Sequence, residues 1–303
     1  NLLNFMGLIS IIFKFILLLI VFFIFIYFLK KFKKYKLVFK SNGLDGIYYY
    51  FKNKNFKNSG IWNFIDKKKY KLGKKLAAYS KEKILFGPYT GTKLVFKSGW
   101  SNTDFGSKYL GTYERQIQKK IIYLKKKFKL NFFVDCGAAE GFHIISLLKK
   151  KIFKTAVAFE INEKSRDLLI KNAIKNNVKK KISIYSEANF ESLKDLEIKN
   201  FKKTLFLLDI EGNEFDLFDA DFCKYFSKSF FIIEDHNCLI MNKKKISLFY
   251  KNIKKFFKVE IVEDNFENPL DYDVLHNFTE DEKYLIMSEG RPVRMQWIIL
   301  LPK

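Results

Sequence analysis

The chain of 303 residues is long enough for one large domain with a small addition, and its apolar fraction of 48% supports a substantial core. Its formal net charge of +24 does not indicate a nucleic-acid partner, because only four of the 56 basic residues are arginine, which makes forked contacts with phosphates and bases. The three cysteines (Cys136, Cys223 and Cys238) lack any CxxC spacing, which argues against a structural zinc site and a disulfide framework.

A long apolar segment dominates the N-terminal part of the chain. Residues 5–29 are almost entirely apolar, and residues 15–29 contain no charge, glycine or proline. About 20 apolar residues suffice for a helix that spans a bilayer. Five lysines follow within residues 30–36, and basic residues beside a span favour the cytoplasmic side. A cleaved signal peptide is the alternative, but it needs a small-residue cleavage site. The sequence therefore predicts a single-pass membrane helix, with the following residues facing the cytoplasm.

The next segment has weaker patterns. Residues 46–51 have the composition of a strand, and residues 83–96 resemble two strands of a hairpin joined by a glycine-containing loop. Residues 98–111 are rich in glycine, serine, asparagine and threonine, which is typical of a loop. The chain is thus expected to contain a membrane anchor with its basic flank, an N-terminal extension or cap, and a main domain: residues 1–36, 37–110 and 111–303.

From residue 112 onward, helical and strand patterns alternate. Apolar residues at i, i+4, i+7 and i+11 from Ile117 mark an amphipathic helix. Further helices are expected at 142–150 and 163–177, with Asn162 as the N-cap of the second, and around 215–222 and 246–257. Seven short apolar segments have the character of strands: 131–136, 155–160, 181–186, 204–209, 230–234, 259–262 and 296–301. This alternation predicts an α/β protein with a doubly wound, mostly parallel seven-stranded sheet.

Four of the expected strands end in a carboxylate: Asp135, Glu160, Asp209 and Glu234. A single acid of this kind is commonly no more than the polar residue that closes an apolar strand. In doubly wound sheets, however, ligands bind at the carboxyl ends of the strands. Four acids together with the glycine turn 137–141 therefore predict one shared binding crevice.

The glycine turn indicates the kind of ligand. Gly137 and Gly141 allow a tight turn before a helix, and Glu160 lies where dinucleotide-binding folds place the acid that binds ribose hydroxyls. The turn lacks the GxGxxG spacing that a pyrophosphate requires. Asp135 and Glu140 would repel a pyrophosphate but tolerate a sulfonium and an ammonium. The residues therefore favour a nucleoside that carries a cationic group.

Two stretches carry a resemblance to a known family. Residues 134–141 resemble the first motif of class I S-adenosylmethionine-dependent methyltransferases, and residues 208–214 resemble the D-x-E-G-x-E signature of the FkbM-like methyltransferases. Glu160, with the helix ending at residues 172–177, is similar to the second motif of that family. The stretch 111–114 also matches a common FkbM-like pattern. The resemblance covers residues 110–301 and implies a Rossmann-like methyltransferase fold.

The resemblance also implies roles for individual residues. The cofactor would be S-adenosylmethionine, held at its methionine part, ribose and adenine by Asp135, Gly137, Ala138, Gly141, Glu160, Ile161 and Glu187. The candidates for removing a proton from the methyl acceptor are His236, Asp209, Glu211 and Glu234. Glu140 departs from the family, which usually has a small or apolar residue there. Asp209, Glu211 and His236 could also bind a divalent metal, but no spacing motif supports it and no metal is expected.

These features lead to one expectation about function and two alternatives. We expect a membrane-anchored methyltransferase that methylates a hydroxyl on a glycan, a lipid-linked sugar or a small metabolite, with no nucleic-acid partner. The alternatives are an NAD(P)-type oxidoreductase and a non-catalytic membrane scaffold of the same fold. Residues 263–295 interrupt the last strands, and we expect them to cover the crevice. Within them, Arg291 and Arg294 either bind an anionic acceptor or pair with nearby acids.

Overall fold

The computed structural model describes residues 60–198, 200–240, 242–263, 265, 267–291 and 295–303. The expected membrane helix, its basic flank and the expected strand at 46–51 lie outside the described residues. Within the described ranges, no helix is both long and apolar enough to cross a bilayer. Residues 65–303 form one compact unit, which contains the sheet and the candidate site.

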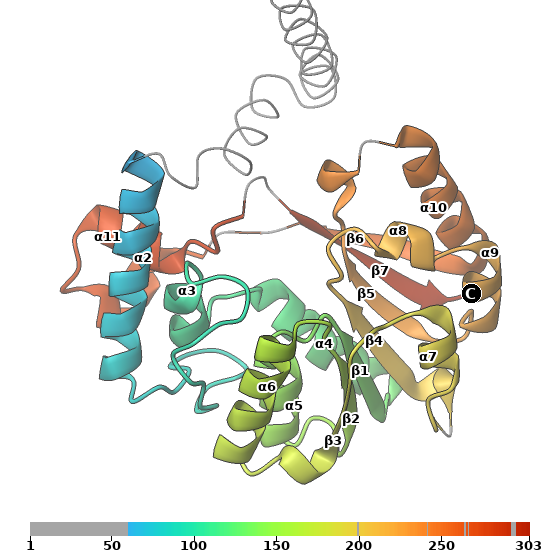
Figure 1. Ribbon diagram of the computed structural model, residues 1–303, viewed down its shortest axis with the longest axis horizontal. Helices are drawn as coiled ribbons and strands as arrows, with labels where there is room; N and C mark the ends of the chain where they lie inside the picture. The colour runs from blue at the N-terminus through green and yellow to red at the C-terminus, as the bar shows by residue number, and fades with distance from the viewer. Residues whose placement is uncertain (1–59, 199, 241, 264, 266, 292–294) are drawn as a thin grey trace, which may run out of the picture. The chain divides into compact units, whose positions relative to one another are not determined.

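A seven-stranded sheet forms the centre of this unit (Figure 1). Its strands are β1 Phe132–Cys136, β2 Ala156–Phe159, β3 Ile182–Tyr185, β4 Thr204–Leu208, β5 Phe230–Glu234, β6 Phe257–Glu263 and β7 Gln296–Pro302. They lie in the order β3-β2-β1-β4-β5-β7-β6, parallel except for β7, which is antiparallel to both neighbours. The predicted mostly parallel, seven-stranded sheet is confirmed. The strand order reverses between β1 and β4, so a crevice opens at their carboxyl ends.

Helices cover both faces of the sheet, which explains the continuous apolar strands. One face packs on α4 Arg115–Phe128, α5 Phe142–Lys149 and α6 Glu163–Lys175. The other packs on α7 Phe190–Lys194, α8 Glu214–Leu217, α9 Ala220–Tyr225 and α10 Lys243–Phe256. As predicted, Asn162 caps α6, because its side chain accepts a hydrogen bond from the Ser165 N–H. Short 3-10 helices connect some of these elements: η1 Lys179–Lys181, η2 Phe201–Lys203, η3 Asn237–Leu239, η4 Pro269–Asp271 and η5 Asp273–Leu275.

Alternation along the strands sorts side chains onto the two faces. Phe133, Leu207, Ile232 and Ile299 belong to the core on the α4–α5 face, whereas Val134, Phe206, Ile233 and Ile298 belong to the core on the opposite face. By the same period, the side chains of Asp135, Glu234 and Trp297 point to the α4–α5 face at the edge where the parallel strands end. The acids predicted from strand ends are thus brought to one side of the sheet.

Four of the described helices were not expected from the sequence: α2 Gly60–Tyr79, α3 Phe105–Leu110, α7 Phe190–Lys194 and α11 Glu280–Met287. The predicted loop at 98–111 is wrong where α3 forms, because Phe105 and Tyr109 are buried in the core shared with the sheet. Gly106 permits this packing, since a Cβ there would lie 2.4 Å from the carbonyl oxygen of Ile286 in α11. The hairpin expected at 83–96 forms only in part: an antiparallel bridge joins Lys83 and Lys93, and the Ile84 N–H donates to the Thr92 carbonyl at 2.9 Å, but the two arms do not extend into strands.

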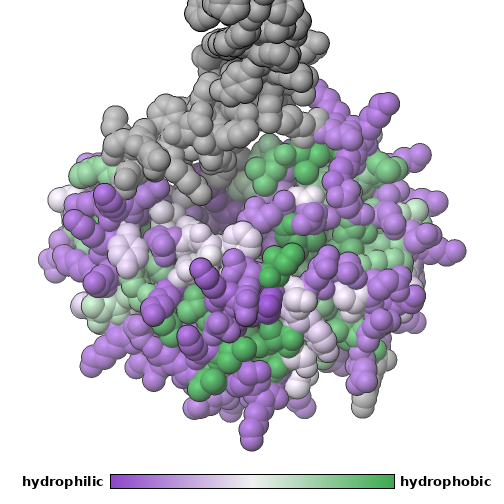
Figure 2. Space-filling view, in the orientation of Figure 1, coloured by the Kyte–Doolittle hydropathy of each residue, from purple (hydrophilic) through white to green (hydrophobic). Residues whose placement is uncertain are grey.

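The face of the molecule drawn in Figure 2 is largely hydrophilic. Figure 2 shows hydrophilic side chains spread across one face of the molecule, with hydrophobic residues in narrow stretches between them.

Candidate active site

The glycine turn after β1 brings the chain against the end of β4. Gly137 has φ +85°, and a Cβ at this position would lie 1.7 Å from the carbonyl oxygen of Asp209. The N–H groups of Gly137 and Ala138 donate to the carbonyl of Phe159 at 2.9 and 3.0 Å. Gly141 also has a left-handed φ, of +87°, at the start of α5. Only glycine allows so close an approach at position 137, so the turn joins the ends of three strands.

Glu160 holds this turn to the end of β2. Its two carboxylate oxygens accept hydrogen bonds from the N–H groups of Ala139 and Asn162, at 2.8 and 2.7 Å. Each oxygen retains a second lone pair that can accept from a ligand hydroxyl. The next side chain, Ile161, is 68% exposed and offers an apolar surface beside the acid. Glu187 follows β3, is exposed, and binds Ser192 only through its backbone carbonyl.

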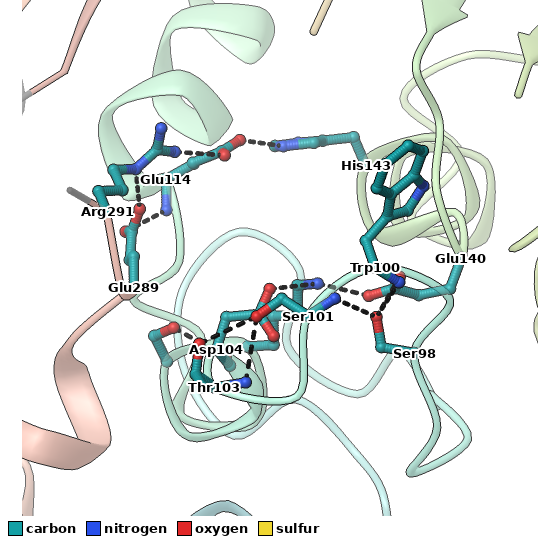
Figure 3. Close-up of polar contacts among 12 residues, drawn as sticks. Ser98, Trp100, Ser101, Thr103, Asp104, Glu114, Glu140, His143, Glu289 and Arg291 are labelled. Atoms are coloured by element: carbon teal, nitrogen blue, oxygen red, sulfur yellow. Dashed lines mark hydrogen bonds and ion pairs between the residues drawn. The ribbon is translucent and has the colours of Figure 1, made fainter. Parts of the chain in front are cut away.

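Glu140, whose charge departs from the motif that the turn resembles, is held by a charged partner (Figure 3). Its carboxylate pairs with the buried ammonium of Lys108 in α3, which also lies 2.8 Å from Asp104. Ser98 Oγ donates to the second oxygen of Glu140 at 3.4 Å. Although burial favours the neutral amine, the carboxylates of Asp104 and Glu140 raise the pKa of Lys108. Glu140 therefore fixes α3 and the loop before it onto the glycine turn.

Glu114 is a buried hub that the sequence interpretation left without a role. Figure 3 shows it between Arg291 and His143, with distances of 2.6 Å to Arg291 Nη2 and 2.7 Å to His143 Nε2. Its backbone N–H donates to Glu289 at 2.8 Å. Burial opposes ionisation, but His143 and Arg291 lower the pKa of Glu114 to about 2. In the sequence, the only indication of a role for Glu114 was its place in residues 111–114, which match a common FkbM-like pattern.

The four predicted catalytic residues lie together beyond β4 and β5. His236 Nε2 is 3.2 Å from Glu234, 3.5 Å from Asp209 and 3.8 Å from Glu211. The other ring nitrogen, Nδ1, lies 2.9 Å from the buried carboxylate of Glu214. Exposure differs sharply within the group: the Asp209 side chain is 31% exposed and that of Glu211 is 62% exposed, whereas His236 and Glu234 are buried.

These surroundings give two of the candidate bases, His236 and Asp209, different pKa values. Burial favours the neutral ring of His236, but its hydrogen bond to Glu214 and the nearby carboxylates raise its pKa to about 9. Burial raises the pKa of Asp209 to about 6, and His236 and Arg291 oppose part of that rise. At neutral pH, His236 is therefore an imidazolium that cannot accept a proton, whereas Asp209 is a carboxylate that can. These pKa values leave Asp209, rather than His236, able to accept a proton.

The same cluster contains a set of possible metal ligands. One atom each from Asp209, Glu234 and His236 lie within 4.8 Å of one another. However, Arg291 pairs with Glu234 as well as with Glu114 and Glu289. The guanidinium and the imidazolium already supply positive charge to the acids. Of the two options for Arg291, pairing with nearby acids is what the structure contains, and Arg294 lies outside the described residues.

A cavity of about 40 Å³ lies between the glycine turn and the strand ends. Its walls combine predicted residues with Lys108, Glu114 and Trp297, which the sequence interpretation did not assign to the site. The lining residues are Lys108, Tyr113, Glu114, Asp135, Gly137, Ala138, Ala139, Glu140, Phe142, His143, Leu207, Asp209 and Trp297. Burial raises the pKa of Asp135 to about 7, so a cation in this cavity would also favour its carboxylate form.

Comparisons with known proteins give likenesses of fold only. No family model and no curated protein matches the chain. An O-methyltransferase from Bacillus cereus, solved with SAH, is 13% identical over 60% of this chain and 79% of that chain, with a TM-score of 0.42. The O-methyltransferase TomG from Streptomyces achromogenes, solved with SAM, is 8% identical over 63% and 81%, with a TM-score of 0.42. A precorrin-6y C5,15-methyltransferase from Geobacter metallireducens is 13% identical over 63% and 89%, with a TM-score of 0.40. At these values the assignment of function depends on the chain's own residues.

Proposed function

We propose that the protein is an S-adenosylmethionine-dependent methyltransferase that acts on a hydroxyl group. The observation that carries this proposal is the glycine turn pressed against Asp209, with Glu160 bound to its backbone and acids around the adjoining cavity. The resemblance of residues 134–141 and 208–214 to methyltransferase motifs supports the same activity.

The residues present fit this cofactor. Glu160 keeps one lone pair on each oxygen for the two ribose hydroxyls, and the exposed Ile161 offers an apolar surface for the adenine. Asp135 lines the cavity, where a carboxylate favours the positive sulfonium and ammonium groups of the methionine part. A pyrophosphate would meet Asp135 and Glu140 instead, which disfavours the NAD(P)-type oxidoreductase.

When bound, S-adenosylmethionine supplies an electrophilic methyl group. The chain must then position the acceptor hydroxyl and remove its proton. Asp209 lines the cavity, has a partly exposed side chain and suits the second task. His236, fixed by Glu214 at 2.9 Å, lies beside Asp209 as a cation and stabilises its ionised form.

The acceptor and its location belong to the same proposal. The apolar residues 5–29 and the lysines that follow support a membrane anchor with the enzyme on the cytoplasmic side. An enzyme held there would meet a membrane-associated acceptor, such as a glycan or a lipid-linked sugar, as readily as a small metabolite. Carbonate extraction of membranes that contain the full chain tests the anchor, since an integral protein remains in the pellet.

Isothermal titration of the full chain in detergent tests the cofactor. We expect binding of S-adenosylmethionine and none of NAD. Glu160→Gln should weaken that binding at least tenfold, because the amide cannot accept hydrogen bonds at its nitrogen. Glu163→Gln is the matched control, since Glu163 is exposed in the next helix, α6. Binding of NAD alone would refute the proposal, and binding of neither ligand would favour the scaffold.

A further inference from the structure

Trp297 in β7 is a buried part of the cavity wall with an unusual feature. The residue is 1% exposed and pairs in register with Glu234 of β5. Its side chain lines the same cavity as Asp209 and Asp135. Among the described residues, no acceptor forms a hydrogen bond with its indole N–H. A buried N–H without an acceptor lowers stability, so its retention in a cavity wall points to a ligand.

Asp209 presents the complementary feature. Its Oδ1 atom is buried and accepts no hydrogen bond from the described residues, and His236 Nε2 lies 3.5 Å from it. Two buried atoms of the cavity-lining residues thus have no hydrogen-bond partner: the Trp297 N–H, a donor, and Asp209 Oδ1, an acceptor whose contact with His236 is an ion pair. Other charged groups of the wall are paired: Lys108 with Asp104 and Glu140, and Glu114 with His143 and Arg291.

We propose that Asp209 and Trp297 together recognise the acceptor hydroxyl, an inference that rests on the proposed methyltransferase function. A hydroxyl is both a donor and an acceptor, so one group can donate to Asp209 Oδ1 and accept from the Trp297 N–H. A carboxylate offers no donor to Asp209, and an ammonium offers no lone pair to Trp297. The pair thus selects alcohols over acids and protonated amines.

This arrangement also accounts for the proton. With S-adenosylmethionine bound, the hydroxyl proton would pass to Asp209 Oδ1, and the oxygen electron pair would form the bond to the methyl carbon while the carbon–sulfur bond breaks and its pair stays on sulfur. The Trp297 N–H stabilises the negative charge that develops on the oxygen before the new bond is complete. Asp209 then releases its proton to solvent through its exposed edge. Trp297 is therefore a residue that positions and polarises the acceptor.

Indole ¹H–¹⁵N spectra of the full chain in detergent test this inference. The chain contains three tryptophans, and Trp297→Phe assigns the Trp297 signal. Ethylene glycol serves as the hydroxyl probe, added after saturation with S-adenosylhomocysteine. We expect a saturable downfield shift of the Trp297 N–H signal, no shift of the Trp100 signal, and at least a fivefold weaker response in Asp209→Asn. Sodium acetate and methylammonium chloride at equal concentration should produce no such shift.

Two results would overturn the inference. The first is a Trp297 signal that ethylene glycol does not move. The second is a signal that moves to its end point with S-adenosylhomocysteine alone, which would assign Trp297 to the cofactor. Titration calorimetry separates these from failure of the proposed function: Trp297→Phe should bind S-adenosylmethionine within twofold of the parent, as should Trp100→Phe. If the parent binds no S-adenosylmethionine, the proposed function fails. The titration with ethylene glycol alone would then still show whether a hydroxyl reaches the Trp297 N–H.

Discussion

Replacing Gly137 with alanine should destabilise the protein more than the same substitution at Gly91, a glycine with a similar φ but no close neighbour. The backbone there has φ +85°, which costs an alanine about 1–2 kcal/mol. The new Cβ would also lie 1.7 Å from the carbonyl oxygen of Asp209, and forced overpacking of this kind costs about 1–3 kcal/mol. The sum is about 2–5 kcal/mol, to be measured as the loss of unfolding free energy in urea.

Gly91 is the matched control for this substitution. It has nearly the same φ, +83°, but a Cβ there would have no neighbour within 4 Å. Gly91→Ala should therefore lose only the conformational part, about 1–2 kcal/mol. Equal losses in the two variants would show that the backbone of β4 does not approach the glycine turn closely, and the geometry of the site would have to be revised.

Two further predictions test the electrostatics around the site. Because the pKa of His236 is raised to about 9 in the folded protein from about 6.5 when unfolded, its contribution is complete below pH 6.5 and lost as pH rises to 9. The unfolding free energy should fall by up to about 3 kcal/mol over that window, and His236→Gln should flatten the fall; an equal slope in both proteins would contradict this explanation. Lys108→Met should cost about 3–5 kcal/mol, because it leaves Asp104 and Glu140 buried without a cation. Adding Glu140→Gln to that variant should restore part of the loss in the same urea titration, and strict additivity would show that the pair does not interact.

The parallel sheet could be predicted because its signal is local. A strand covered on both faces is apolar throughout, as in Phe230–Glu234, so five residues suffice to reveal it. The acids at the strand ends are equally local, and the rule for parallel sheets brings them together. Helix α3 could not be found in this way, because Phe105–Leu110 forms a helix in a polar, glycine-containing stretch by packing on α11 and the core.

The residues missed at the site depend on contacts distant in sequence. Trp297 reaches the cavity because β7 runs antiparallel beside β5 and brings it opposite Glu234, a register that no local pattern encodes. Glu114 becomes a hub only when Arg291, 177 residues later, folds back onto it. The charge of Glu140 looked anomalous in the turn because its partner, Lys108, belongs to the unpredicted helix α3.

The strand-end acids show how one residue type acquires different properties at one edge of a sheet. Glu160 is bound by two backbone N–H groups, so it is fixed in place and can accept further hydrogen bonds. Glu234 is paired with Arg291, so its carboxylate holds the segment that contains Arg291. Asp209 alone combines a buried oxygen without a donor, a raised pKa and an exposed edge. A base needs all three, because it must meet the acceptor, hold a proton briefly and release it to solvent. The assignment of Asp209 thus follows from its surroundings, since its neighbours share its chemistry but lack this combination.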